Sequence, residues 1–318
     1  MTEQSGRPRT DAKRVTVAIA QSAPVYLDKR ASLAKALDLI QQAAKQGARL
    51  VAFGETWLAG YPAWLDVCPG AALWQNPSAK DVFARLRNNS ITVPGEEVNL
   101  LNEAARDLKI AIVIGVNERV DSGPGSGTLY NSLLTISDDG QLKNHHRKLV
   151  PTYTERLVWG NGDGRGLEAA PTSVGRVGGL ICWEHWMPLA RMAMHNSREH
   201  IHVAVWPTVH ELHQLASRHY AFEGRCFVLA VGLMMPASDL PRELHDSATL
   251  RAGNRHWIER GGSAIIGPDA QYVLNPVFDR EELLVSDLDL AQIDREMMTF
   301  DVSGHYARPD LFRFEKKL

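Results

Sequence analysis

The stretch Gly178-Gly179-Leu180-Ile181-Cys182-Trp183-Glu184-His185 is a short apolar run that ends in a thiol. Residues 177–181 have the pattern of a buried strand, and the paired glycines allow other parts of the chain to approach its backbone closely. In an open α/β sheet, chemistry concentrates at the carboxyl ends of strands. Cys182 is therefore either a small buried hydrophobe or a nucleophile, and the rest of the chain has to distinguish the two.

Strands and helices alternate on both sides of this segment. Helical spacing of apolar residues predicts helices over 33–44, 96–108, 187–196 and 214–224. Short apolar runs predict strands over 14–21, 50–53, 110–116, 202–206, 227–233, 262–267 and 283–288, and a hairpin around 138–140. The alternation is typical of an α/β fold, with residues 14–318 as a single domain and residues 1–13 as a disordered tail.

Charge and composition argue against several classes of partner. The 318 residues carry 35 basic and 37 acidic side chains without a long run of one sign, so we expect neither nucleic acid nor a membrane surface as a partner. No apolar stretch is long enough to span a bilayer, and the polar first thirteen residues do not resemble a secretory signal. Three cysteines, an odd number in a long chain, favour free thiols and a cytoplasmic location.

Two charged residues stand where predicted strands give way to long irregular segments. Glu55 precedes residues 56–94, which are rich in proline and tryptophan, and Lys148 precedes the glycine-rich residues 150–172. Loops of this length usually have a functional role. A carboxylate can accept the proton of a thiol, and an ammonium can stabilise negative charge that develops on a substrate. Together with Cys182, these two residues form a candidate catalytic set.

Three ordered blocks of sequence resemble the signature blocks of the nitrilase superfamily. They are Phe53-Gly54-Glu55-Thr56-Trp57-Leu58-Ala59-Gly60-Tyr61-Pro62, His146-Arg147-Lys148-Leu149-Val150-Pro151-Thr152 and Cys182-Trp183-Glu184-His185. The resemblance implies a Glu-Lys-Cys catalytic triad at Glu55, Lys148 and Cys182, with Glu155 as an additional catalytic glutamate. The blocks at 155–164 and 304–310 are similar to those of the true nitrilase branch. Gly54 departs from the pattern, because many members of the family have proline before the glutamate.

The resemblance also implies a fold, a reaction and an assembly. The expected fold is a four-layer α-β-β-α sandwich whose protomers pair into a homodimer or a higher homo-oligomer. The expected reaction hydrolyses a nitrile to the carboxylic acid and ammonia through a thioimidate and a thioester, without metal or organic cofactor. An amidase, a carbamoylase or a cyanide-converting enzyme is the alternative within the superfamily. A non-catalytic binding protein with this fold is a more distant alternative.

Aromatic residues are concentrated in the same segments. Seven of the eight tryptophans lie in or beside the proposed site, which suggests a pocket with flat apolar walls and an aromatic or arylaliphatic nitrile as substrate. The expected substrate-binding residues are Trp57, Tyr61, Trp159 and Trp183.

Other polar residues have simpler interpretations. Cys226 and Cys68 are expected to be core residues, and Glu184 is expected to form a structural salt bridge. The histidines of His210-Glu211-Leu212-His213 are three residues apart rather than four, which does not match a zinc-binding helix. We expect these histidines and the pair His145-His146 to be structural or solvated, and no metal site is predicted.

Overall fold

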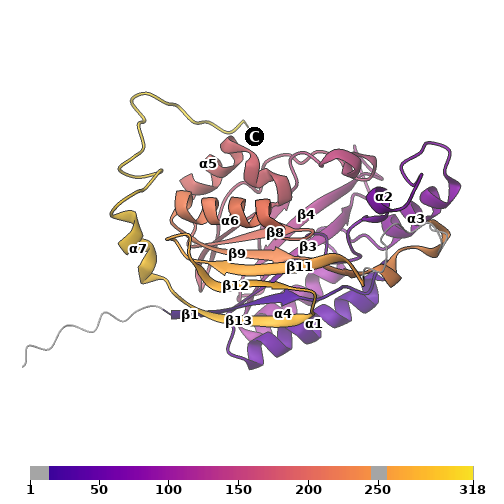
Figure 1. The fold of residues 1–318 in the computed structure, drawn as a ribbon, viewed down its shortest axis with the longest axis horizontal. Helices are drawn as coiled ribbons and strands as arrows, with labels where there is room; N and C mark the ends of the chain where they lie inside the picture. The colour runs from indigo at the N-terminus through magenta and orange to yellow at the C-terminus, as the bar shows by residue number, and fades with distance from the viewer. Residues whose placement is uncertain (1–13, 245–255, 318) are drawn as a thin grey trace, which may run out of the picture.

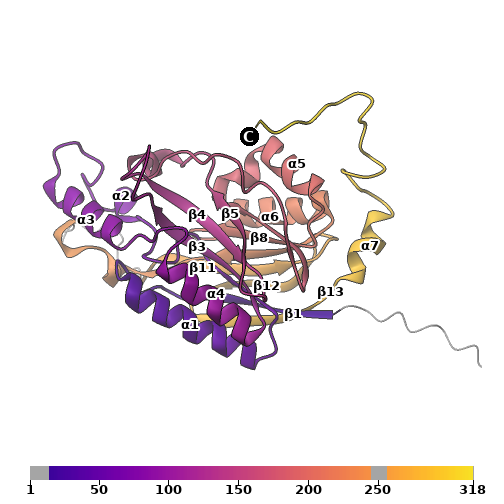
Figure 2. The ribbon, with the colours of Figure 1, turned by 180° about the vertical axis from the view of Figure 1, so that it is seen from behind.

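Two β-sheets lie face to face, with helices on both outer sides (Figures 1 and 2). The structure is a computed structural model that describes residues 14–244 and 256–317. The tail predicted for residues 1–13 lies outside the described residues. The expected four-layer α-β-β-α sandwich is confirmed.

The first sheet has the order β13-β1-β2-β3-β4-β5. Its strands are β1 (Arg14–Gln21), β2 (Leu50–Phe53), β3 (Ala111–Arg119), β4 (Leu129–Ile136), β5 (Leu142–Arg147) and β13 (Glu282–Asp289). The second sheet has the order β10-β11-β9-β8-β7-β6, and β12 also pairs with β11. Its strands are β6 (Ala170–Thr172), β7 (Gly175–Ile181), β8 (Ile201–Trp206), β9 (Phe227–Gly232), β10 (Met234–Pro236), β11 (Trp257–Ile266) and β12 (Tyr272–Phe278).

Alternating side chains of the first sheet divide the core into two parts. In β1, Val17 and Ile19 pack into the layer between the sheets, whereas Ala18 and Ala20 pack on the opposite face under the helices. Both faces are apolar because both are covered, which explains why β1 and β2 are nearly continuous hydrophobic runs.

Helices α1 (Lys29–Lys45) and α4 (Glu96–Leu108) cover the first sheet, and α5 (Pro188–Asn196) and α6 (Glu211–Gly224) cover the second (Figures 1 and 2). The Asp28 side chain caps α1 by accepting a hydrogen bond from the Ala31 amide at 2.9 Å. Short 3-10 helices occur at η1 (Tyr153–Leu157), η2 (Cys182–Trp186), η3 (Ala237–Asp239) and η4 (Arg242–Leu244), and α7 (Ala291–Met297) follows β13. None of the helices in the described part of the chain is both long and apolar enough to cross a membrane.

The prediction that residues 56–94 form no regular element is wrong. This segment contains α2 (Trp64–Val67) and the twelve-residue α3 (Pro77–Asn88). Asn76 caps α3 through a hydrogen bond from the Ala79 amide, and Pro77 occupies the first helical position, where a missing N–H costs nothing. The prolines that suggested a loop therefore include one that begins a helix.

Candidate active site

Each of the three predicted catalytic residues follows a strand. Glu55 comes two residues after β2, Lys148 directly after β5 and Cys182 directly after β7. Cys182 also begins η2 in the left-handed region, with φ 54°. A non-glycine residue rarely adopts this conformation, which here turns the chain sharply out of the strand at the thiol.

Lys148 lies between two carboxylates. Its Nζ atom is 3.0 Å from Oε1 of Glu55 and 2.7 Å from Oε2 of Glu155, and all three side chains are almost completely buried. Asn131 donates a hydrogen bond of 2.7 Å to Oε1 of Glu55, and the hydroxyl of Tyr61 donates one of 2.8 Å to Oε1 of Glu155. The predicted residues Glu55, Lys148 and Glu155 are thus joined in a single hydrogen-bonded group.

The other oxygen of Glu55, Oε2, is buried and has no hydrogen-bond partner. Burial raises the pKa of Glu55 to about 7, against the opposing effect of Lys148. Burial also raises the pKa of the Cys182 thiol well above its usual value, although the Lys148 ammonium favours the thiolate. A basic carboxylate oxygen without a partner, next to a lysine that interacts with the thiol, can receive the thiol proton.

Two glycines permit this close assembly. A β-carbon on Gly115 would lie 2.3 Å from the carbonyl oxygen of Gly54, so only glycine allows β3 to pass behind Glu55. A β-carbon on Gly179 would lie 2.6 Å from Cδ2 of Leu133, so this glycine lets β7 approach β4 across the layer between the sheets. Gly115 and Asn131 were not among the predicted site residues, although Asn131 is a polar residue inside the largely apolar strand β4.

The predicted substrate-binding residues have different surroundings. Tyr61 and Trp159 are buried side by side, with ring centroids 5.8 Å apart. Trp183 is 56% exposed and lines a cavity of about 670 Å³ with Tyr153 and Trp186. Trp57 is fully buried in the core and donates a hydrogen bond to the carbonyl oxygen of Ser22, so its position does not support contact with a substrate.

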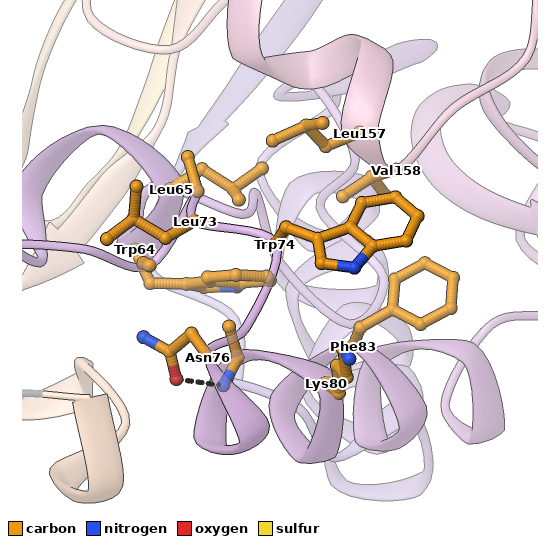
Figure 3. Close-up of a pocket in the computed structure, with 12 residues that line it drawn as sticks. Trp64, Leu65, Leu73, Trp74, Asn76, Lys80, Phe83, Leu157 and Val158 are labelled. Atoms are coloured by element: carbon orange, nitrogen blue, oxygen red, sulfur yellow. Dashed lines mark hydrogen bonds between the residues drawn. The ribbon is translucent and has the colours of Figure 1, made fainter.

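A second cavity, of about 330 Å³, is mainly apolar (Figure 3). Trp64, Leu65, Leu73, Trp74 and Phe83 come from α2, α3 and the segment between them, and Leu157 and Val158 follow Glu155 along the chain. Thr154 donates a hydrogen bond of 2.5 Å to Asp66, which ties α2 to η1. The walls of this cavity are therefore direct continuations of the segments that carry Tyr61 and Glu155.

Glu184 forms the structural salt bridge that was predicted for it. Its Oε2 atom is 2.8 Å from Nε2 of His146, and it accepts hydrogen bonds from the amides of Leu149 and Ile181. His213 lies in the first turn of α6, where its ring stacks on Trp206 at 4.4 Å. Within residues 14–244 and 256–317, no group of three His, Cys, Asp or Glu side chains is arranged to hold a metal ion.

A model of one protein family, described as carbon-nitrogen hydrolase, matches residues 16–295. The chain belongs to the carbon-nitrogen hydrolase family. Its predicted membership of the nitrilase superfamily is thereby confirmed, and it is an enzyme that hydrolyses carbon–nitrogen bonds.

Curated members of the carbon-nitrogen hydrolase family align with almost the whole chain. "Nitrilase 2" of an unknown prokaryotic organism is 41% identical over 95% of this chain and 92% of its own length. "Aliphatic nitrilase" of Sinorhizobium fredii is 39% identical over 93% of both chains. "Arylacetonitrilase" of Aspergillus kawachii is 35% identical over 94% of this chain and 91% of its own.

The fold is also that of solved carbon-nitrogen hydrolases. Saccharomyces cerevisiae Nit3, described as a member of branch 10 of the nitrilase superfamily, superposes with a TM-score of 0.69. The alignment covers 92% of this chain and 96% of Nit3, with 20% sequence identity. At this identity the similarity establishes the shared fold alone.

Proposed function

We propose that this enzyme is a nitrilase that converts an organic nitrile to the carboxylic acid and ammonia, with Cys182 as the nucleophile. The observation that carries the proposal is the buried group of Glu55, Lys148 and Glu155, which interacts electrostatically with the thiol and leaves Oε2 of Glu55 free. The names of the curated relatives support a nitrile as the substrate.

In the first half of the proposed reaction, Oε2 of Glu55 takes the thiol proton and Sγ attacks the nitrile carbon. The nitrile nitrogen receives a proton from Glu55, which gives a neutral thioimidate. Lys148 and the backbone N–H of Trp183, which faces the sulfur, stabilise the negative charge that develops during attack.

In the second half, a water molecule adds to the thioimidate carbon. Protonation of the nitrogen then releases ammonia and leaves a thioester. A second water hydrolyses the thioester, giving the acid and restoring the thiol. Glu55 transfers the protons, and Glu155, which holds Lys148 from the other side, helps to position the water. If the tetrahedral intermediate expelled the thiol before ammonia, an amide would be a by-product.

The proposal can be tested by supplying a nitrile and the amide of the same acid separately. For each substrate, the rate of ammonia release is measured and the product is identified. Hydrolysis of the nitrile to the acid at the higher rate is expected. Cys182→Ala should reduce kcat by at least about 10³-fold, because the nucleophile is removed. The control Cys68→Ala, at a buried cysteine outside the site, should keep its activity. Faster hydrolysis of the amide, or substantial turnover by Cys182→Ala, would contradict the proposal.

We further propose that the substrate is aromatic or arylaliphatic, with Tyr61, Trp159 and Trp183 as its contacts. Two cavities support an aromatic substrate. Trp183 lines one of them, and the apolar cavity in Figure 3 has aromatic and aliphatic walls that continue from the segments of Tyr61 and Glu155. Trp57 is left out of the contact set because its ring is enclosed in the core.

We also propose a homodimer as the minimal assembly. Leu212 and Leu215 lie on one face of α6 and are 65% and 57% exposed, and Leu189 of α5 is 72% exposed. Apolar side chains at helical spacing on an outer face are typical of a surface that another protein covers. All three cysteines are free thiols, in keeping with the proposed cytoplasmic location.

A further inference from the structure

A chain of buried polar side chains extends from the backbone of Cys182 into the protein. The carbonyl oxygen of Cys182 is 2.7 Å from Nδ1 of His185, and Nε2 of His185 is 2.9 Å from Nε2 of His202. Nδ1 of His202 is 2.8 Å from Oε2 of Glu199, and the hydroxyl of Tyr220 donates to the other oxygen of Glu199. All of these side chains are at most 4% exposed.

The contacts allow one arrangement of protons when both imidazoles are neutral. A carbonyl oxygen only accepts, so Nδ1 of His185 carries the hydrogen and its Nε2 is an acceptor. His202 must then donate from Nε2, which leaves its Nδ1 as an acceptor. Glu199 must therefore be a protonated acid that donates to His202.

Burial favours this arrangement of protons. It lowers the pKa of His185 and of His202 well below the usual value for histidine, which keeps both rings neutral. Burial also raises the pKa of Glu199 to about 7, so the acid is mostly protonated below neutral pH.

Ionisation of Glu199 would reverse the donors in the contacts between Glu199, His202 and His185, while Tyr220 would still donate to Glu199. A carboxylate needs a hydrogen from Nδ1 of His202, so Nε2 of His202 becomes an acceptor and Nε2 of His185 must donate. Nδ1 of His185 then presents a lone pair to the carbonyl oxygen of Cys182 at 2.7 Å, which is repulsive. The protonation of Glu199 is thus coupled to the backbone of the residue that carries the thiol.

The surroundings of Glu199 are built to hold this acid. A β-carbon on Gly178 would lie 1.8 Å from Oε2 of Glu199, so the first glycine of the pair in β7 makes room for the carboxyl group. His195 of α5, 3.8 Å away, and Cys226 are the other titratable groups that face it, besides His202 and Tyr220. Nε2 of His195 contacts Glu223, which is paired with Arg191.

We propose that protonated Glu199, His202 and His185 are positioning residues that hold the left-handed turn at Cys182 through its carbonyl oxygen. The inference deepens the proposed function, because it rests on Cys182 as the nucleophile. It assigns a role to His185, which follows Cys182 by three residues, and to Gly178, the first glycine of the pair in β7.

Two substitutions separate this role from simple packing. Glu199→Gln preserves the contacts, because the amide nitrogen donates to His202 and the amide oxygen accepts from Tyr220. Glu199→Met has a similar size and no donor. We would measure kcat and KM for a nitrile and the rate at which iodoacetamide labels Cys182 from pH 6 to 9, and the thermal unfolding temperature from pH 4.5 to 9.

Glu199→Gln should retain kcat within about threefold at pH 7 and lack the alkaline decline that ionisation of Glu199 causes in the parent enzyme. Glu199→Met should lose about tenfold or more in kcat with little change in KM, since a buried acceptor on His202 is left unsatisfied. Because burial raises the pKa of Glu199 from 4.5 to about 7, its stabilising effect is fully present below about pH 4.5 and is lost as the pH rises from there to about 7. The parent enzyme should therefore lose thermal stability relative to Glu199→Gln over that range.

Equal losses of kcat in Glu199→Gln and Glu199→Met would show that the ionised acid is required, and would overturn the proposal. If Glu199→Gln and Glu199→Met both keep the kcat and the pH profile of the parent enzyme, the hydrogen-bonded side chains have only a packing role, and the proposal is refuted. If Glu199→Met does not fold, His185 offers a second test. Asn at position 185 keeps a donor near the Cys182 carbonyl and Leu does not, so iodoacetamide should label Cys182 faster in His185→Asn than in His185→Leu. Equal labelling rates would refute the inference. Labelling of Cys182 does not need turnover, so a failure of the proposed nitrilase activity is recognised separately.

Discussion

At the scale of single residues, the two oxygens of Glu55 have different environments. Oε1 accepts hydrogen bonds from Asn131 and Lys148, whereas Oε2 is buried and has none. The carboxylate form is needed to accept the thiol proton, and burial raises the pKa of Glu55 to about 7. We therefore expect kcat/KM to fall about tenfold per pH unit below this value.

Asn131 offers a direct test of this assignment. Its hydrogen bond favours the carboxylate and so lowers the pKa of Glu55, against the effect of burial. In Asn131→Ala the acid limb of the kcat/KM profile should move to higher pH, by up to about one unit. The profile is measured by steady-state kinetics from pH 5 to 9. A shift to lower pH, or an unchanged limb together with lost activity, would argue that Glu55 is not the group that titrates.

Among the elements, α2, α3 and η1 enclose the cavity that we propose to hold the aryl group of the substrate (Figure 3). Trp74 is 84% exposed, so its removal should leave the fold intact. Trp74→Ala should raise KM for phenylacetonitrile about tenfold, because the ring loses apolar contact, and leave KM for a small aliphatic nitrile unchanged.

Asp81→Ala, at an exposed position on α3 that does not line the cavity, is the control and should resemble the parent enzyme. If Trp74→Ala changed KM for both nitriles by the same factor, the aryl group would not bind against Trp74. Equal or better turnover of acetonitrile than of phenylacetonitrile by the parent enzyme would exclude the proposed aryl preference.

In the assembled fold, the two outer helical layers differ in how much leucine they expose. Leu189, Leu212 and Leu215 on α5 and α6 are more exposed than Leu100 on α4. The exposed leucines of α6 are proposed to lie in a dimer interface, and α4 covers the opposite side of the sandwich (Figures 1 and 2). Light scattering should give twice the mass of one chain. The double substitution Leu212→Glu and Leu215→Glu should give a monomer, because two charges are buried without partners.

Leu100→Glu, at a leucine of α4 that is 38% exposed, should leave the dimer unchanged. A parent enzyme that is monomeric at micromolar concentration would contradict the proposal.

Several elements could be predicted because their cause is local. The predicted strand over 14–21 is β1, and the predicted helix over 96–108 is α4. β12 and α3 were missed for different reasons. β12 has side chains that are only partly buried and carries a proline, and α3 begins with a proline inside a segment whose composition suggests a loop.

The order of residues along the chain was sufficient for the fold class, for the family and for a candidate set of Glu55, Lys148, Glu155 and Cys182, because short motifs and periodic apolar residues are properties of neighbouring positions. Folding was needed to reveal the free oxygen of Glu55, its support by Asn131, and the buried line from Cys182 to Glu199. These features depend on burial and on contacts between distant strands. The pKa values that govern the chemistry arise from the same burial, which no local stretch of sequence records.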